Sequence, residues 1–453
     1  MALGFRGGIG LDLSVPRALP IVGTESSEKL IYPLPKDFGA LVFPGDTVSH
    51  DTVIAVHPDG SLLGANVCGS VSAVSAERIE IFANDMPPPD QPPIAAKITD
   101  LAREEILDHI RLTGLIAENG HPMWRMLAPF VGKGETLILN AVETDAGVTC
   151  KHAMLRSYAP KVLGGLKLLM RLLALDKAVV VMTEHMQIEA DTLRKNLNSK
   201  GLIDIYAVEE KYPCENPRVL YKALTGSHGA PSEHASVIVT VQDCIWVYEA
   251  FVCGRPSGYR TVTVDGNNFL LRLGTPIAEL PRLCSLSVDN SAKAYIGGWV
   301  GGKLAEASSA VTASVSAVHF AVKQAPTPES CIRCGKCHDV CPVGLLPMRL
   351  YQYIEKGNLM RCQSLEIDAC IACGACSAVC PSYLPLADRI EAGMIALATA
   401  SSKQIVDENP AQAASAVAVE EIGVMEEVEG DVGITTAYVV EIGSISEEEA
   451  KNQ

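Results

Sequence analysis

The sequence lacks any apolar run long enough to predict a membrane span. The best candidates are residues 162–175, interrupted by Lys167 and Arg171, and residues 310–322, which contain His319 and many small residues. A span needs about 18 or more consecutive apolar residues. A basic surplus is also lacking, because 37 Lys and Arg stand against 53 Asp and Glu, for a formal net charge of −16. We therefore expect no membrane span and no nucleic-acid partner.

The N-terminus lacks a secretory pattern. Residues 1–10 are rich in glycine, and no apolar stretch of signal-peptide type follows them. The sequence therefore predicts a cytoplasmic protein, in which thiols stay reduced. The 15 cysteines of such a chain favour metal ligands or catalytic thiols over disulfides.

Length and composition predict a globular chain of several domains. With 453 residues, of which 48% are hydrophobic and 20% charged, the chain has room for roughly two to four domains. The acidity is uneven, since residues 404–453 hold twelve Asp and Glu and one Lys. We expect residues 401–453 to form a flexible acidic tail.

The hydrophobic pattern changes along the chain. Residues 1–85 are typical of short strands separated by turns, with strands expected at 41–43, 53–56 and 79–81. Five prolines within residues 84–93 then indicate a linker, because they cannot continue a helix or a central strand.

Residues 97–258 alternate between the strand period and the helix period. The expected strands are 136–142, 178–182, 202–208 and 236–241, and the expected helices are 101–113, 161–175, 186–198, 217–224 and 245–252. Such alternation predicts parallel strands joined by right-handed crossovers, and hence an α/β domain. Short β-like runs return in residues 260–300.

Two cysteine runs within residues 326–400 give the strongest chemical signal. Each has the form CxxCxxCxxxCP; the first contains Cys331, Cys334, Cys337 and Cys341, and the second contains Cys370, Cys373, Cys376 and Cys380. This spacing is that of bacterial two-cluster ferredoxins, in which the fourth cysteine of each run binds the other cluster. We therefore assign one 4Fe-4S cluster to Cys331, Cys334, Cys337 and Cys380, and the other to Cys370, Cys373, Cys376 and Cys341.

Structural zinc sites are the alternative, because they also use CxxC pairs. Two complete runs, each closed by a proline, favour iron–sulfur clusters close enough for electrons to hop between them. Gly335 and Gly374 let backbone N–H groups approach the clusters. The remaining cysteines have no ligand spacing and are expected to be structural: Cys68, Cys150, Cys214, Cys244, Cys253, Cys284 and Cys362.

Signals for nucleotide binding are weaker. Residues 297–303, GGWVGGK, match the glycines and lysine of a P-loop, but Leu304 replaces the magnesium-binding Ser or Thr and no clean strand precedes them. A tight turn is expected instead. Asn140, Glu143 and Asp145 lie at the carboxyl end of the strand predicted at 136–142, at the edge where open α/β sheets bind ligands. A ligand site and a solvated loop are equally good interpretations of that position.

Short motifs along the chain connect these parts. They are 5–8 (FRGG), 45–48 (GDTV), 64–71, 140–143 (NAVE), 211–213 (KYP), 224–226 (LTG), 260–264, 274–276 (GTP), 297–298 (GG) and 341–347 (CPVGLLP). With the cysteine runs, they make residues 5–390 resemble the C subunit of Rnf electron transport complexes, a family similar to the NADH-oxidising flavoprotein subunit of complex I. The resemblance implies a barrel-sandwich β domain at 1–85, a Rossmann-like flavin and NADH domain at 97–258, a β-grasp domain at 259–310 and a dicluster ferredoxin domain at 326–400.

The chain departs from this family at the flavin loop. Where the family has GxGGAGFP around the flavin phosphate, residues 117–122 are AENGHP, and only Gly120 and the final proline persist. Glu118 places a carboxylate where a phosphate would lie, and the lost glycines remove close backbone approach. The resemblance implies Gly120, Asn140 and Glu143 as ligands of FMN or NADH, but we do not expect a flavin and NADH site of the usual kind.

Two functions are consistent with these observations. The resemblance implies an electron-transfer subunit that relays electrons through two 4Fe-4S clusters between a soluble donor (NADH, ferredoxin or a partner protein) and a redox partner. Such a subunit would serve an Rnf-type complex or a reductase, with the other complex subunits as partners and a place on the inner face of the cell membrane. The alternative is a non-catalytic scaffold or assembly subunit with a relic α/β domain. Whether the chain is itself an oxidoreductase component stays open.

Overall fold

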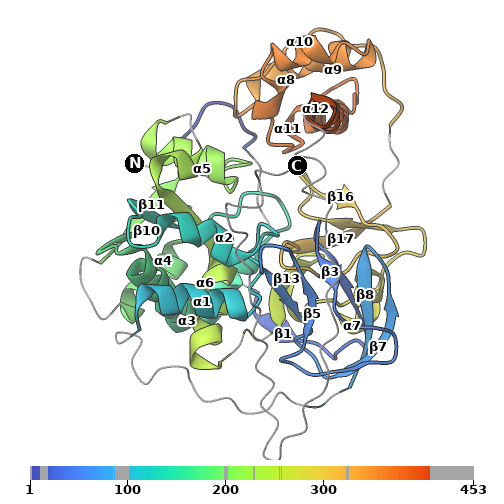
Figure 1. Cartoon of the computed structure of the whole chain (residues 1–453). Helices are drawn as coiled ribbons and strands as arrows, with labels where there is room; N and C mark the ends of the chain where they lie inside the picture. The colour runs from blue at the N-terminus through green and yellow to red at the C-terminus, as the bar shows by residue number, and fades with distance from the viewer. Residues whose placement is uncertain are drawn as a thin grey trace, which may run out of the picture. The chain divides into compact units, whose positions relative to one another are not determined.

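The computed structural model describes most of the chain: residues 3–10, 19–84, 86, 101–197, 202–227, 230–254, 256, 258–322 and 326–408. Residues 1–397 form one compact unit, whose elements are labelled in Figure 1. The expected acidic tail beyond Glu408 lies outside the described residues, and so does the proline linker except for Asn84 and Met86. Within the described ranges, no helix combines the length and apolar character that crossing a membrane requires.

Residues 29–83 form two small antiparallel sheets around a shared apolar core. One has the order β2 (Lys29–Pro33), β8 (Arg78–Ala83), β7 (Gly69–Val74), β4 (Thr47–Val48), and the other has β3 (Gly39–Ala40), β5 (Val53–Val56), β6 (Leu62–Gly64). Alternation along β8 buries Ile79 and Ile81 completely, beside Leu30 and Ile54. The strands expected at 53–56 and 79–81 are confirmed.

The strand expected at 41–43 is wrong. β3 ends at Ala40, and the Phe43 N–H donates to Asp46 Oδ2 (2.7 Å) in a turn. Leu41 and Phe43 are 50% and 72% exposed. The Phe43 N–H thus bonds to the side chain of Asp46 and not to a carbonyl of a neighbouring strand, an arrangement that is common for Asp in turns.

A four-stranded parallel sheet forms the centre of the α/β region. Its order is β11 (Ile203–Val208), β10 (Ala178–Thr183), β9 (Thr136–Asn140), β12 (Ser236–Thr240), with every neighbouring pair parallel. From β9 the chain adds β10 and then β11 on one side, and it then places β12 on the other side of β9. The direction in which strands are added therefore reverses between β9 and β12. Open sheets bind ligands at the carboxyl ends of strands at such a reversal. The predicted parallel α/β sheet is confirmed.

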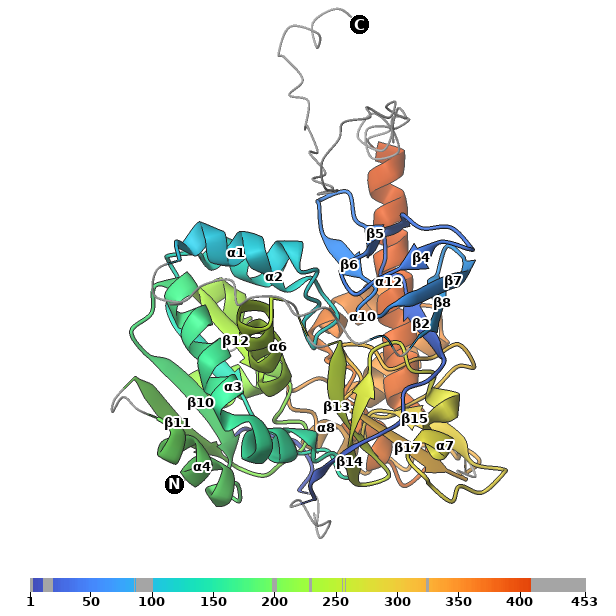
Figure 2. The same ribbon diagram turned by 90° about the horizontal axis from the view of Figure 1, so that it is seen from below.

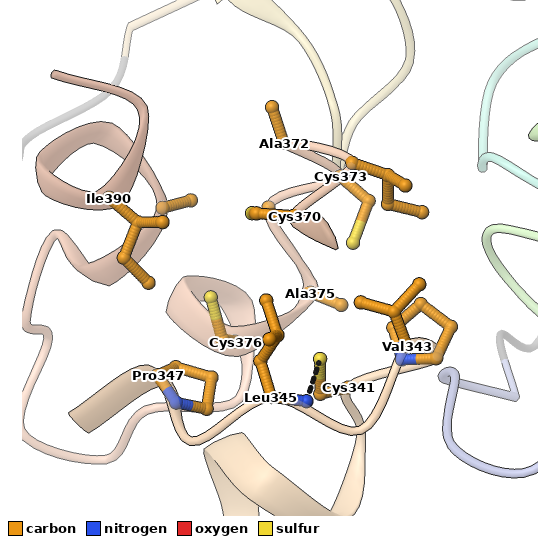
Figure 3. A pocket seen from close by; sticks show the side chains of 14 residues that line it. Cys341, Val343, Leu345, Pro347, Cys370, Ala372, Cys373, Ala375, Cys376 and Ile390 are labelled. Carbon is orange, nitrogen blue, oxygen red and sulfur yellow. Dashed lines mark hydrogen bonds between the residues drawn. The ribbon is translucent and has the colours of Figure 1, made fainter. Parts of the chain in front are cut away.

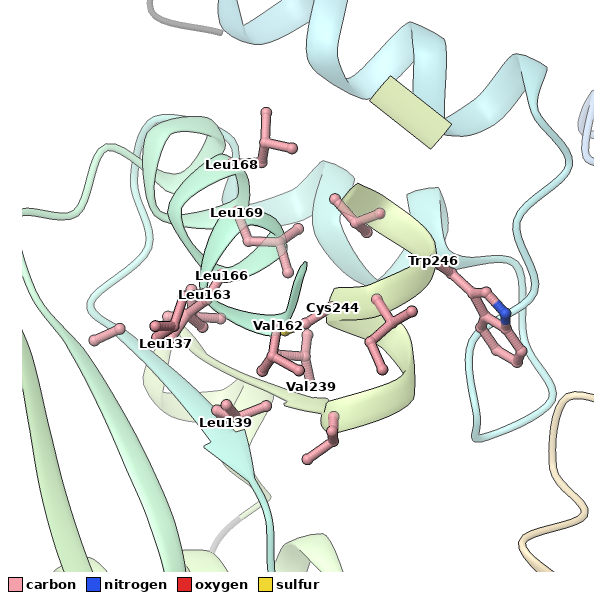
Figure 4. Packing of buried hydrophobic residues seen from close by; sticks show 14 of the residues in the cluster. Leu137, Leu139, Val162, Leu163, Leu166, Leu168, Leu169, Val239, Cys244 and Trp246 are labelled. Carbon is pink, nitrogen blue, oxygen red and sulfur yellow. The ribbon is translucent and has the colours of Figure 1, made fainter. Parts of the chain in front are cut away.

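Helices cover both faces of this sheet. α1 (Arg103–Leu112), α2 (Met123–Leu127), α3 (Cys150–Leu173), α4 (Gln187–Asn196) and α6 (Val241–Val252) share the core that contains Leu137 and Leu139 of β9. Figure 2 shows these layers, and Figure 4 shows α3 packed beside α6. α5 (Pro217–Thr225) contributes Leu220 to a separate core with Ile138. Side chains alternate between the two faces of β9, so Leu137 and Leu139 belong to one core and Ile138, between them, belongs to the other.

α3 is longer than the helix predicted at 161–175. It begins at Cys150 and kinks at Tyr158 (φ −126°, ψ 23°), shortly before Pro160. A proline within a periodic run predicts a helix boundary from sequence. Burial of Met154 and Leu155 in the main core holds the turns before the kink in place. The helix predicted at 245–252 also begins earlier, where Thr240 and Asp243 form a capping box.

A six-stranded mixed sheet combines residues from both ends of the chain. Its order is β1 (Ile21–Gly23), β14 (Asn267–Arg272), β13 (Tyr259–Val264), β17 (Ala317–Ala321), β15 (Lys293–Ile296), β16 (Lys303–Leu304). α7 (Leu280–Leu283) adds Leu280 to its core, beside Val262 and Val318. β1 pairs in parallel with β14, so the short strands expected in 260–300 are joined by a strand from near the N-terminus.

Within the described residues 326–408, the cysteine runs lie among four short helices and one long helix. These are α8 (Lys336–Asp339), α9 (Pro347–Glu355), α10 (Leu359–Gln363), α11 (Ala375–Ala378) and α12 (Leu386–Glu408). Leu350, Cys362, Ile367 and Ile390 form their small core. Cys362 is completely buried, in agreement with its expected structural role. Together the sheets and helices make a mixed α/β fold with several sheets, as predicted.

Candidate iron–sulfur sites and the edge of the parallel sheet

The two cysteine runs repeat one backbone conformation. The residue two positions after the first cysteine of each run has a positive φ (57° at Arg333, 50° at Ala372), and so has the glycine before the third cysteine (81° at Gly335, 79° at Gly374). A one-turn helix, α8 or α11, follows each glycine. This conformation is costly for other residues, so the φ angles explain why glycine stands at these two positions.

Three cysteines of the second run share a cavity with the fourth cysteine of the first. Cys341, Cys370, Cys373 and Cys376 line this hollow together with apolar side chains such as Val343, Leu345, Pro347 and Ile390. Figure 3 shows the four cysteines around it. In the other set, burial is the main cause that raises the pKa of the Cys337 thiol, and the charge of Cys380 also raises it. The fold therefore brings together residues from different runs.

The sulfur atoms lie among backbone N–H donors and apolar walls. The Leu345 N–H donates to Cys341 Sγ (3.3 Å), and the Arg333 N–H donates to Cys331 Sγ (3.4 Å). Burial raises the pKa of Cys376 to about 12, so a bound cluster must provide the free energy that removes these thiol protons. Four soft thiols around a hollow with largely apolar walls fit an iron–sulfur cluster.

The cysteines outside the runs are mostly buried. Cys68, Cys150, Cys214, Cys244, Cys284 and Cys362 are buried, whereas Cys253 is exposed. Burial raises the pKa of the Cys214 thiol to about 12, which keeps it in the unreactive thiol form.

Asn140 and Glu143 stabilise the fold at the carboxyl end of β9. Asn140 Nδ2 donates to the Glu215 carbonyl (2.8 Å), and its Oδ1 accepts the Val142 N–H (3.2 Å). Glu143 accepts the N–H groups of Lys151 (2.8 Å) and His152 (3.2 Å) at the start of α3. The side chains of Asn140 and Glu143, which the sequence offered as cofactor ligands, thus already have hydrogen-bond partners within the protein. A carboxylate at a helix N-terminus is a favourable arrangement by itself.

Glu118 lies at the point where the strand order reverses. Its N–H donates to Asp243 Oδ1 (2.8 Å), directly after β12, and its Oε1 pairs with Arg260 Nη2 (3.0 Å). The Arg260 side chain is completely buried. Burial raises the pKa of Glu118, but the charges of Arg260 and Lys151 outweigh burial and hold that pKa below its usual value. The loop therefore supplies its own buried anion.

These residues do not fit the phosphate of a flavin. Such a phosphate brings a charge of about −2, and the edge already holds the buried carboxylates of Glu143 and Asp243 and the partly buried one of Glu118, against Lys151 and Arg260. The Glu118 N–H, which a phosphate loop would offer to its ligand, is used by Asp243. Sequence reasoning noticed Glu118 but had no signal for Arg260 as its partner, because 142 residues separate them.

Helix α2, which follows the altered loop, packs against the N-terminal β unit. Trp124 Nε1 donates to Ser61 Oγ (2.9 Å), and the Arg125 guanidinium pairs with Asp59. Gly120 adopts a positive φ of 82°, which a turn at this point requires. It lines a separate cavity of about 260 Å³ beside Leu115 and Trp246, away from Asn140 and Glu143.

Residues 297–303 form a turn, as predicted. β15 and β16 flank it as an antiparallel pair with Ile296 opposite Lys303. The expectation that no strand precedes these residues is wrong, because β15 ends directly before Gly297. The strand that follows, β16, stands where a P-loop would begin its helix.

Two family models match the parts of the chain just described. Residues 108–248 match the Nuo51 FMN-binding domain, and residues 330–383 match the 4Fe-4S dicluster domain. Fold and cysteine runs thus define an electron-transfer protein that joins an FMN-binding type of α/β fold to a two-cluster ferredoxin domain. The prediction of two 4Fe-4S clusters is confirmed.

Relatives of the chain belong to redox complexes. It is 28% identical over 358 residues to the C subunit of the ion-translocating oxidoreductase complex of Buchnera aphidicola from Acyrthosiphon pisum, with 75% of each chain covered. It is 26% identical over 381 residues to the C subunit of the Na(+)-translocating ferredoxin:NAD(+) oxidoreductase complex of Acetobacterium woodii, covering 76% of this chain and 86% of that one. Of the corresponding Actinobacillus succinogenes protein it spans 47%, at 27% identity. The predicted resemblance to the family of Rnf C subunits is confirmed.

Proposed function

We propose that the chain is a subunit that relays electrons through two 4Fe-4S clusters between a donor protein and the other subunits of a redox complex. The observation that carries this proposal is the shared cavity of Cys341, Cys370, Cys373 and Cys376. Each transfer moves one electron from the donor to a cluster, and N–H donors such as that of Leu345 offset the added negative charge.

The crossed ligand assignment is part of this proposal. One cluster is bound by Cys331, Cys334, Cys337 and Cys380, and the other by Cys370, Cys373, Cys376 and Cys341. Its support is the place of Cys341 in the second run's cavity, among Cys370, Cys373 and Cys376. We call the cluster of Cys331, Cys334, Cys337 and Cys380 the outer cluster, because Cys334 is exposed and nearby Ile332 is 67% exposed. The other is the inner cluster, because the loop that carries Cys373 and Gly374 contacts Tyr212 and Val300.

A protein donor is favoured over a flavin bound at the usual loop. At the usual loop a phosphate would meet the Glu118 carboxylate, which pairs with Arg260, and the Glu118 N–H is already used by Asp243. The exposed edge of the outer cluster is the natural place for a redox partner to approach. The proposed partners are other subunits of an Rnf-type complex, through which the chain would reach the inner face of the cell membrane.

The finer domain description is also a proposal. It comprises a barrel-sandwich domain at 1–85, a Rossmann-like domain at 97–258, a β-grasp domain at 259–310 and the ferredoxin domain at 326–400. The two antiparallel sheets with one core, the parallel sheet, and the mixed sheet with α7 support the first three.

Anaerobic purification with iron, sulfide and flavin analysis tests the function. We expect about eight irons per chain, no stoichiometric flavin, and absorbance near 400 nm that bleaches with a reduced partner protein but not with NADH. Stoichiometric flavin with bleaching by NADH would contradict the protein-donor proposal. Clusters that no reductant changes would favour the scaffold.

Paired cysteine variants test the crossed assignment. Cys341→Ala should remove mainly the inner cluster and Cys337→Ala mainly the outer one, so their electron paramagnetic resonance (EPR) spectra should retain different signals. Cys253→Ala, an exposed cysteine outside the runs, is the control and should keep both. Loss of the same signal in Cys341→Ala and Cys337→Ala would disprove the crossing.

A further inference from the structure

The glycine turn at residues 297–302 binds a carboxylate of the protein itself. The N–H groups of Val300 and Gly301 donate to the two carboxylate oxygens of Asp145, each at 3.0 Å, and the Trp299 N–H donates to the Ala146 carbonyl (3.1 Å). A Cβ on Gly298 would lie 2.1 Å from Asp145 Cγ. The glycines that imitate a P-loop are thus required for close contact with Asp145, in the loop after β9.

The same turn contacts the loop that holds the inner cluster. Gly374 lies between Cys373 and Cys376, and a Cβ there would stand 2.9 Å from the Val300 carbonyl oxygen. Such closeness leaves no space for a side chain at this contact. The turn therefore touches Asp145 on one side and the ligand loop on the other.

Tyr212 completes the contact. It follows β11, is 4% exposed, and its hydroxyl donates a hydrogen bond to the Cys373 carbonyl oxygen. A Cβ on Gly301 would lie 2.7 Å from Tyr212 Oη and 3.3 Å from Asp145 Oδ2. Tyr212, the turn and the ligand loop thus meet at one point, with Asp145 as the anchor. Figure 3 shows Cys373 on the wall of the inner-cluster cavity.

We propose that Tyr212 is a positioning residue for the inner cluster: its hydroxyl, held by the turn that Asp145 anchors, fixes the Cys373 segment and raises the reduction potential of that cluster. The proposal rests on the proposed function, because it needs clusters at these cysteines. Reduction adds one electron to the cluster, and an O–H dipole aimed at the backbone of a ligand stabilises the added negative charge. Among the described residues, the Tyr212 hydroxyl hydrogen-bonds to the Cys373 carbonyl and not to the loop of Cys331, Cys334 and Cys337, so the potential of the outer cluster should not depend on this hydroxyl.

Tyr212→Phe removes the hydroxyl and keeps the ring. In the full-length protein with both clusters, an anaerobic redox titration followed by EPR should show one signal shifted to a more negative potential and the other unchanged. Tyr206→Phe, at an exposed position on β11, is the matched control and should shift neither.

Each result supports or overturns the positioning role. Loss of the inner cluster alone in Tyr212→Phe, with the outer signal at its wild-type potential, would also support it. Two assembled clusters with unchanged potentials, or equal shifts of both, would overturn it while leaving the proposed function intact. A wild-type protein without two reducible clusters would instead overturn the proposed function, and this proposal with it.

Discussion

Buried charges at the edge of the parallel sheet are the residue-scale feature that sets this chain apart. Glu118, Asp243 and Arg260 form a group with little exposure, in which one guanidinium holds one carboxylate directly. Buried ion pairs add little net stability, but removing one partner leaves the other charge uncompensated. A substitution of one member of this group is therefore expected to require a compensating substitution of its partner.

Arg260→Met should destabilise the fold by about 3 to 5 kcal/mol, because it leaves Glu118 buried without its partner. Adding Glu118→Gln should recover much of that loss. Thermal unfolding under anaerobic conditions measures both. Arg194→Ala, which breaks an exposed pair with Asp191, should cost less than about 1 kcal/mol. A loss as small as this in Arg260→Met would show that the buried pair is dispensable.

Glu215 should make stability depend on pH. Burial raises its pKa from 4.5 to about 7, so the folded state binds the proton more tightly than the unfolded state. Its unfavourable effect is therefore absent below about pH 4.5, grows as pH rises towards 7 and is complete above that value. Glu215→Gln should be more stable than the wild type by up to about 3 kcal/mol at pH 8 and equal to it near pH 4. A stability difference that does not vary with pH would contradict this account.

At the scale of elements, the contact between α3 and α6 organises the α/β core. A Cβ on Gly165 of α3 would lie 1.9 Å from the Cys244 carbonyl oxygen of α6, so the two backbones approach more closely than any side chain permits. Val162 and Leu169 on α3 lie beside Cys244 of α6, whereas Trp246 points away from α3 on the other side of α6 (Figure 4). Close approach of this kind increases the apolar area that both helices bury.

Gly165→Ala should therefore destabilise the protein by roughly 1 to 3 kcal/mol or more, since helix backbone, unlike a flexible side chain, cannot move aside cheaply. The higher helix propensity of alanine offsets only about 1 kcal/mol of this. Lys167→Ala, at an exposed position on the same helix, should change stability by less than about 0.5 kcal/mol. Chemical denaturation of the two variants in parallel gives the comparison, and equal stabilities would rule out a tight contact.

At the scale of the whole unit, segments distant in sequence hold the cluster region. The Gly8 N–H donates to the Val340 carbonyl (2.7 Å), and the Ile9 N–H donates to the Tyr212 carbonyl (2.9 Å). A Cβ on Gly7 would lie 2.6 Å from the Cys341 carbonyl oxygen. The N-terminal residues thus connect β11 and Tyr212 to a ligand of the inner cluster.

Removing residues 409–453 should leave folding and iron content unchanged, because residues 1–397 form a compact unit with their own cores. Iron analysis and the thermal unfolding midpoint of the shortened protein check this. A matched deletion of residues 1–10 should instead lower the iron content, since it removes the contacts to Val340 and Cys341. Iron loss in the first variant would show that the acidic residues support the clusters.

The sequence by itself determined the chemistry and the class of fold. The spacing of the cysteines predicts the clusters because most ligands of one cluster are close neighbours in the sequence. The alternation of strand-like and helix-like hydrophobic patterns predicts the parallel sheet because each element buries one face in its own period. Only the tertiary structure decided the partner of Glu118, the early start of α3, the use of the glycine turn by Asp145, and the contact of Tyr212 with Cys373. Those features join positions far apart in the chain, and no local pattern encodes which distant groups meet when the sheets and helices pack.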